Sequence, residues 1–238
     1  MRKFENDVMA AFGYAHSATA QSLESQHFYP CRDISMFVPY FQNRIMNKSR
    51  LEAFSDGVFA IIITIMVLEL KVPEGTSWDT MKHLLPVFGS YIMSFVFIAI
   101  YWMNHHHIMH TLKKVNGGIL WANMHLLFWL SLIPFATGWM GENNFERVTV
   151  ALYGALLILS GLAYTILSSA ICKTYTEHTK LSTAIAKGNV KGVWSIILYS
   201  ASIPLALFIH PALAAVLIVA VSVMWIIPSK DIERALED

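Results

Sequence analysis

Residues 50–73 read RLEAFSDGVFAIIITIMVLELKVP, and this stretch decides the fold of the chain. From Phe54 to Leu70 it is apolar with few interruptions, close to the length of a helix that crosses the hydrocarbon core of a bilayer. Lipid offers the backbone no hydrogen-bond partners, so a segment of this kind is stable there only as a helix or in a closed barrel. We therefore expect a transmembrane helix.

The composition of the whole chain also indicates a membrane protein. Of 238 residues, 55% are hydrophobic and 14% are charged, whereas a soluble domain has about 25% charged residues. The 17 Lys and Arg residues nearly balance the 16 Asp and Glu residues, and nothing indicates the concentrated basic face that binds nucleic acid. We expect membrane lipid, and no nucleic acid, around this protein.

Six segments have the length and apolar character of spanning helices. They are Phe54–Leu70, Leu84–Met103, Gly118–Met140, Val148–Ile171, Val193–Ile209 and Pro211–Ile227. The last two are separated only by His210 and Pro211, and because proline removes a backbone donor we expect a tight hairpin there. Pro134 and Pro204 should interrupt the third and fifth helices. The predicted fold class is an all-α polytopic membrane protein.

Basic residues predict the orientation, because short loops rich in Lys and Arg stay in the cytoplasm. Eleven basic residues fall on one face of the six spans and three on the other. The eleven are Arg44, Lys48, Arg50, Lys113, Lys114, Lys173, Lys180, Lys187, Lys191, Lys230 and Arg234, and the three are Lys71, Lys82 and Arg147. Both termini are therefore expected in the cytoplasm, and the protein in the cell membrane.

The transmembrane domain is expected to occupy residues 46–228. Residues 1–45 mix polar and aromatic residues without a helical period, which indicates a poorly ordered cytoplasmic extension. Because Met46 stands just before the first helix, a gene start assigned too early is an alternative for this segment. Residues 229–238 are expected to form a cytoplasmic tail.

The first helix carries polar groups in its first two turns, among them Arg50, Ser55 and Asp56. One interpretation places them at the interface, where Ser55 and Asp56 cap the helix and Arg50 reaches toward water. The other gives them partners on another helix, because such groups are costly in lipid unless they are paired. The second helix ends on the same side with WMNHHH at residues 102–107, so this interpretation predicts a polar network between the first two helices.

Two motifs in these helices resemble the transmembrane protein 175 family. They are Arg-x-x-x-Phe-Ser-Asp at Arg50, Phe54, Ser55 and Asp56, and Trp-x-x-His-His at Trp102, His105 and His106. The resemblance covers roughly residues 50–141. It implies a potassium channel, assembled as a homotetramer of six-helix subunits with the first helices lining a central pore. The motif residues would form the network that braces the pore helix.

The resemblance also implies pore constrictions at Ile61, Ile65 and Leu68, with Thr64 beside them. Their spacing of i, i+3, i+4 and i+7 places the four on one stripe of a helix. Periodicity alone does not choose this stripe, because almost every face of the helix is apolar, and such isoleucines ordinarily face lipid or pack in a core.

The implied filter differs from the usual one. Ordinary potassium channels strip water from the ion with carbonyls of a Thr-Val-Gly-Tyr-Gly loop, and this chain has no such sequence. A narrow apolar ring would instead favour weakly hydrated potassium over sodium, and no cofactor is expected besides the permeant ion. Glu69 is expected either to lie at the interface or to concentrate cations at the outer end of the pore.

Several histidines suggest other roles. The cluster His105, His106, His107 and His110 suits a metal site in part, but no carboxylate or cysteine completes it in sequence, so we predict no metal site and favour a structural or proton-sensing role. His125, within the third span, is expected to face protein and to serve as a hydrogen-bond partner between helices.

Enzymatic activity is not expected, because the G-x-S-x-G, H-E-x-x-H and P-loop motifs are all absent from the sequence. Two other functions stay open. A secondary transporter also carries polar groups within its spans, although carriers usually have broken helices and polar residues at mid-membrane, whereas residues 61–68 are apolar apart from Thr64. A non-conducting membrane scaffold is the third alternative.

Overall fold

The computed structural model describes residues 47–74, 76–112, 114–175 and 180–226. The extension expected at residues 1–45 and the tail expected at residues 229–238 lie outside these ranges. The described part of the chain is helical and contains no strand. Its elements, in order, are α3 (Lys48–Leu68), α4 (Trp78–Thr111), α5 (Gly117–Ser131), α6 (Ile133–Glu142), α7 (Arg147–Cys172), α8 (Lys180–Pro204), the π-helix η1 (Leu205–Ile209) and α9 (Pro211–Ile226).

Five stretches of the described residues are long and apolar enough to cross a membrane. They are Lys48–Leu68, Leu84–Thr111, Gly117–Glu142, Arg147–Cys172 and Val190–Ile209. The sixth expected span corresponds to α9, which has 16 residues and reaches the last described residue, whereas a spanning helix needs about 20. The all-helical membrane fold is confirmed, and the count of six spans stays a prediction.

Capping residues and prolines determine where several of the helices begin and break. Asn47 caps the start of α3 by accepting a hydrogen bond from the backbone N–H of Ser49 at 3.2 Å. The third span breaks at Leu132, and Pro134 lies in the first turn of the helix that follows, where its missing N–H costs little. Beyond Pro204 the fifth span continues as a π-helix. Both predicted interruptions are confirmed.

A tight turn joins η1 to α9, as predicted. The backbone of His210 is extended, with φ −156° and ψ 129°. Its N–H donates to the carbonyl of Leu205 at 2.9 Å, and its imidazole Nδ1 accepts from the N–H of Ala212 at 3.2 Å. The last π-helical turn and the first turn of α9 are therefore both capped by this one residue.

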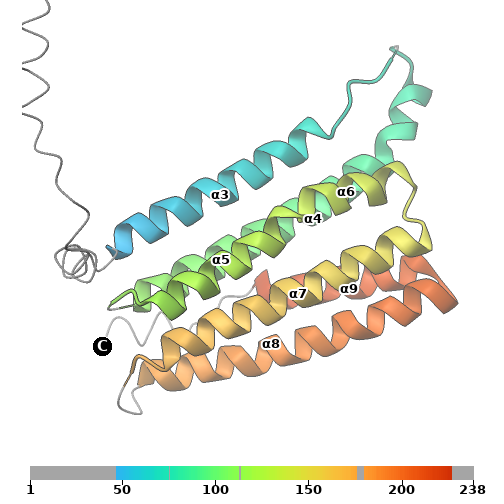
Figure 1. Ribbon diagram of the computed structural model, residues 1–238. Helices are drawn as coiled ribbons and strands as arrows, with labels where there is room; N and C mark the ends of the chain where they lie inside the picture. Colours follow the sequence, from blue (N-terminus) through green and yellow to red (C-terminus); the bar gives the residue numbers. More distant parts are fainter. Residues whose placement is uncertain (1–46, 75, 113, 176–179, 227–238) are drawn as a thin grey trace, which may run out of the picture. The chain divides into compact units, whose positions relative to one another are not determined.

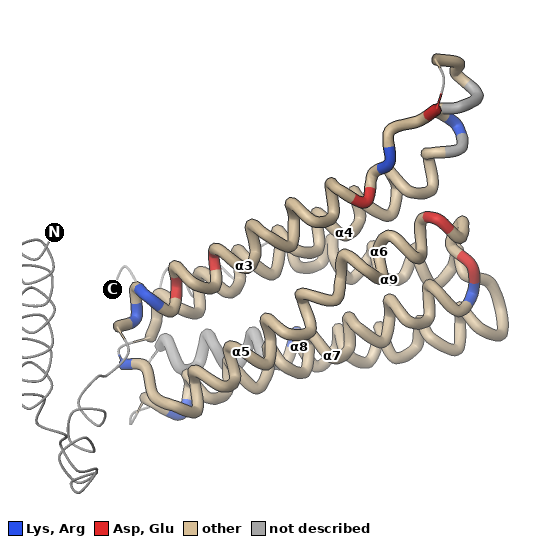
Figure 2. Tube along the Cα trace, turned by 45° about the horizontal axis from the view of Figure 1, so that its top comes forward, with Lys and Arg blue, Asp and Glu red and all other residues tan. Residues whose placement is uncertain are grey.

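The helices lie lengthwise beside one another (Figure 1). Helix α3 packs against α4, α5 and α6, α5 packs on α7, and α8 packs against α7 and α9. Charged residues gather near the helix ends and leave the middle lengths largely free of charge (Figure 2). That distribution suits helices with their ends in water and their centres in hydrocarbon.

Hydrogen bonds between helices supplement the apolar packing, which matters because lipid tails provide no hydrophobic force between helices. The hydroxyls of Ser94 on α4 and Tyr153 on α7 lie 2.9 Å apart, and Thr137 on α6 donates to Ser94 at 2.7 Å. On the far side, the indole of Trp225 on α9 donates to Ser195 on α8 at 2.7 Å. These buried or half-buried contacts join three helix pairs, α4 with α7, α4 with α6, and α8 with α9.

Helices α4 and α6 approach each other closely at Gly141. A Cβ atom at this position would lie 2.4 Å from the hydroxyl of Ser90 and 2.7 Å from the Cα of Val87. The second distance involves backbone, which cannot rotate aside. Gly141 therefore sets the spacing between these two helices.

We predict that Gly141→Ala destabilises the protein by about 1–3 kcal/mol, the usual cost of overpacking a close contact. Gly89→Ala is the matched control, because a Cβ at Gly89 on α4 would meet nothing within 4 Å. Thermal unfolding of the two variants in the same detergent should give a lower melting temperature for Gly141→Ala only. Equal melting temperatures would contradict the close contact.

Candidate functional site

Helix α3 presents one uncovered apolar stripe. The exposed fractions of Ile61, Ile65 and Leu68 are 60%, 42% and 75%, and Thr64 between them is exposed as well. The hydroxyl of Thr64 donates to the carbonyl of Ala60 at 2.8 Å, so its proton is satisfied within the helix. The predicted stripe therefore lies outside the core of the subunit, and of its two ordinary explanations only lipid contact remains.

The opposite face of α3 is packed. Phe59, Ile62 and Met66 are at most 2% exposed, and Leu51 and Ser55 continue the same face toward the start of the helix. Because apolar residues occur all around α3, burial distinguishes the two faces where composition does not.

A buried chain of three polar side chains ties α3 to its neighbours. Ser55 donates its hydroxyl to the carbonyl of Leu51 at 2.9 Å and accepts a hydrogen bond from the amide of Asn123 on α5 at 2.9 Å. The amide oxygen of Asn123 lies 2.7 Å from Nε2 of His105 on α4. All three side chains are at most 1% exposed. Asn123 thus joins three helices through one side chain.

A second line of contacts runs along the surface between α3 and α4. The indole N–H of Trp102 donates to the carboxylate of Asp56 at 2.8 Å. The ring of His106 stacks on Trp102 at 5.7 Å between centroids, and the edge of His110 meets His106 at 4.5 Å. The predicted pairing of the first two helices is therefore present at Asp56 and Trp102.

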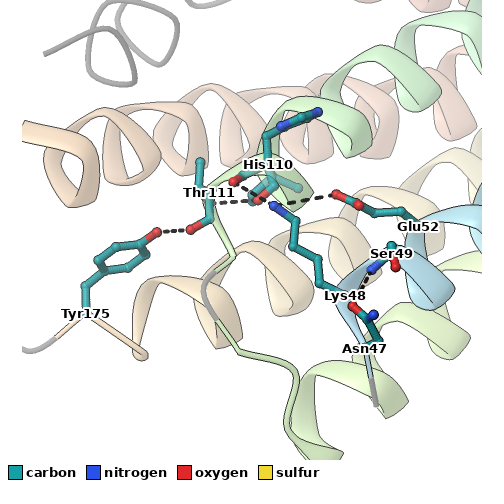
Figure 3. Close-up of polar contacts among 8 residues, drawn as sticks. Asn47, Lys48, Ser49, Glu52, His110, Thr111 and Tyr175 are labelled. Atoms are coloured by element: carbon teal, nitrogen blue, oxygen red, sulfur yellow. Dashed lines mark hydrogen bonds and ion pairs between the residues drawn. The ribbon is translucent and has the colours of Figure 1, made fainter. Parts of the chain in front are cut away.

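Two further contacts lie at the end of α4 (Figure 3). Lys48, in the first turn of α3, donates to the carbonyl of His110 at 2.9 Å and pairs with Glu52 at 3.7 Å. The hydroxyl of Tyr175, which follows α7, donates to the carbonyl of Thr111. The last carbonyls of a helix have no partner within the helix, so α3 and the segment after α7 both cap α4.

The structure brings together most of the predicted network but not all of it. Ser55, Asp56, Trp102, His105 and His106 lie at the contact of α3 with α4 and α5. In contrast, Arg50 and Phe54 are exposed on the opposite side of α3. Within the described residues, the guanidinium of Arg50 makes no hydrogen bond or ion pair.

Sequence reasoning missed Asn123 and misjudged His125. Asn123 is a polar residue within an apolar span, which was the available signal. The expectation that His125 bonds another helix is wrong within the subunit, because its Nε2 accepts a hydrogen bond from Trp129 on the same helix at 2.8 Å and its side chain is exposed. Across the described ranges, no three His, Cys, Asp or Glu side chains form a group that could hold a metal.

Comparisons with known proteins identify relatives of this chain. The family model described as endosomal/lysosomal potassium channel TMEM175 matches residues 50–134, which contain α4, α5 and all but the first two residues of α3. A Chryseobacterium protein named as a potassium channel is 53% identical over 193 residues, covering 81% of this chain and 100% of that protein. A Streptomyces collinus protein, also named as a potassium channel, is 34% identical over 128 residues, covering 50% of this chain and 62% of that protein.

A solved structure has the same fold. The TMEM175 homolog of Chamaesiphon minutus, described as a lysosomal potassium-selective channel, superposes with a TM-score of 0.69 at 25% identity. The match covers 76% of this chain and 97% of that structure.

We predict that Asn123→Ala lowers the free energy of unfolding by about 1–3 kcal/mol, because it removes the side-chain partner of buried His105 Nε2 and the donor to the buried hydroxyl of Ser55. Asn143→Ala is the matched control, since the side chain of Asn143, directly after α6, is exposed and donates to the nearby carbonyl of Trp139. Thermal unfolding in detergent should separate the two variants. A loss of equal size in both would show that the Asn123 bridge contributes nothing special.

Proposed function

The chain belongs to the TMEM175 family, and on that premise we propose that it is a potassium channel, a homotetramer in which four copies of α3 line the pore. The observation that carries the proposal is the division of α3 into two faces. One face is packed and hydrogen-bonded inside the subunit, and the other is an apolar stripe that the subunit leaves uncovered. If four subunits surrounded a symmetry axis that runs along this stripe, the stripes of the four copies would face one another across the axis.

In this arrangement Ile61, Ile65 and Leu68 form successive apolar rings, with the oxygen of Thr64 beside them. A ring of this kind passes an ion that gives up part of its water, and it closes when the narrow apolar section loses its water. Potassium holds its hydration shell less tightly than sodium. Selectivity then arises from the cost of dehydration, with no loop of backbone carbonyls.

The polar contacts brace the pore helix and do not touch the ion. Asn123 holds Ser55, and Trp102 holds Asp56, both on the side of α3 that faces away from the stripe. Because α4 and α5 both form hydrogen bonds with side chains of α3, these contacts fix the rotation of α3 about its own axis. The direction in which the stripe points follows from that rotation.

A channel fits α3 better than a carrier does. Carriers bind substrate where spanning helices are broken near mid-membrane. Helix α3 is unbroken from Lys48 to Leu68, and the breaks in the described part lie at Leu132 and beyond Pro204, in helices that do not carry the stripe. We place the protein in the cell membrane with both termini in the cytoplasm, on the side where the basic residues of the sequence concentrate.

We predict that purified protein in liposomes carries more potassium than sodium, and that Ile61→Asn raises the flux and weakens the discrimination, because a polar side chain wets the ring. The control is Ile166→Asn on α7, where an isoleucine of similar exposure, 50%, lies outside the stripe. Its flux should equal that of the wild type. If the wild-type protein carried no ion flux, a non-conducting scaffold would be favoured. If the flux depended on a second solute, a carrier would be favoured.

We also predict that Asp56→Ala lowers the yield of tetramer or alters the potassium current, because it removes the acceptor for the Trp102 indole. Size-exclusion chromatography with light scattering measures the first effect, and the liposome assay the second. Trp102→Phe, which keeps an aromatic ring but loses the indole N–H and leaves the Asp56 carboxylate in place, should give an effect in the same direction. Unchanged tetramer and unchanged current in Asp56→Ala would remove the bracing role of this contact.

A further inference from the structure

Glu69 is the first residue beyond the apolar stripe. It caps the C-terminus of α3, directly after Leu68, and its side chain is exposed. The C-terminus of a helix carries a partial negative charge from its aligned peptide dipoles. The carboxylate and the helix end therefore add to the same negative field, at the end of α3 opposite the Asp56 contact.

The structure holds this carboxylate in a defined place. A Cβ atom at Gly138 on α6 would lie 3.1 Å from Oε2 of Glu69 and 3.6 Å from its Cδ. Glycine at this position leaves room for the side chain to lie along α6. Glu69 is thus seated against its own subunit, beside the stripe and not within it, so it would surround a pore opening without blocking it.

The basic residue nearest in sequence is paired with a different carboxylate. Lys71 forms a hydrogen-bonded ion pair with Glu142 at the end of α6. That hydrogen bond and the charge of Glu142 raise the pKa of Lys71, and the charge of Glu69 adds a smaller effect in the same direction. Lys71 therefore stays charged, and its charge is balanced by Glu142.

The sequence around this end of the helices carries more acids than bases. The acids are Glu69, Glu74, Asp79, Glu142 and Glu146, against the bases Lys71, Lys82 and Arg147. Arg147 donates to the carbonyl of Leu207 at 3.1 Å, which directs its guanidinium toward η1. Of the five acids, Glu69 is the one adjacent to the stripe.

We infer that Glu69 sets the cation-attracting field at the outer mouth of the pore and thereby raises the rate at which potassium enters from that side. This inference rests on the proposed pore. A fixed negative charge at an opening raises the local concentration of cations, and dissolved salt screens the effect. The screening length is about 30 Å at 0.01 M salt and about 3 Å at 1 M, so the contribution of Glu69 should be large in dilute salt and nearly absent in concentrated salt.

The test is single-channel recording of Glu69→Gln in planar bilayers with potassium chloride at 0.01 M and at 1 M. We expect the current entering from the Glu69 side to fall by roughly 2- to 10-fold in dilute salt and to match the wild type in concentrated salt. Glu146→Gln is the control, because it removes one negative charge from the same end of the molecule at the start of α7. It should lower the dilute-salt current much less than Glu69→Gln does and leave the current in concentrated salt unchanged.

A second variant at the same position shows whether a loss of current in Glu69→Gln comes from the lost charge or from faulty folding or assembly. Glu69→Cys, treated with an anionic thiol reagent, should regain the dilute-salt current, and a cationic reagent should lower it further. The treated wild type shows whether the native cysteines, Cys31 and Cys172, contribute. If Glu69→Gln and Glu69→Cys conduct like the wild type at both salt concentrations, the inference is overturned while the channel stands. If the wild type carries no potassium current at all, the proposed pore fails, and the inference fails with it.

Discussion

The hydrogen-bond chain from Ser55 through Asn123 to His105 is the constraint on which the rest of the structure depends. Each group is buried, and an unpaired polar group in such surroundings costs about 1–3 kcal/mol. Apolar packing alone would not choose a rotation for α3, because the helix is apolar on all sides. The hydrogen-bond chain fixes the rotation of α3, and this rotation leaves the apolar stripe exposed on the surface of the subunit.

The two ends of α3 have different characters as a result. At its start, polar contacts reach α4 and α5, and Lys48 also caps the last turn of α4. At its C-terminal end, the described residues show no hydrogen bond from a side chain of another helix to a side chain of α3. Glu69 lies there beside Gly138 of α6. The first end is held in place, and the second combines an acidic surface with the last turn of the proposed pore. Structural and electrostatic roles are thus separated along one helix.

Much of this was accessible from sequence. The length and apolar character of the segments predicted the helices, and the prolines predicted their interruptions. The polar residues of the first two helices predicted that Asp56 pairs with the end of the second helix. The partners of Asn123 could not be predicted, because they lie on α3 and α4 and only the packing of α5 brings Asn123 to them. His125 was misjudged because a tryptophan one turn later on the same helix satisfies it. The direction of the stripe depends on burial, which a uniformly apolar sequence does not encode.

The position of these contacts along the chain has a consequence for biogenesis. Every group that orients α3 from outside belongs to a later segment, with Trp102 and His105 on α4 and Asn123 on α5. During synthesis α3 emerges before α4 and α5, and at that stage none of these contacts fixes its rotation about its long axis. In the proposed tetramer, the orientation of the α3 surface that would meet the other copies is set only after the third span has been inserted, so we expect the subunit to fold before it oligomerises.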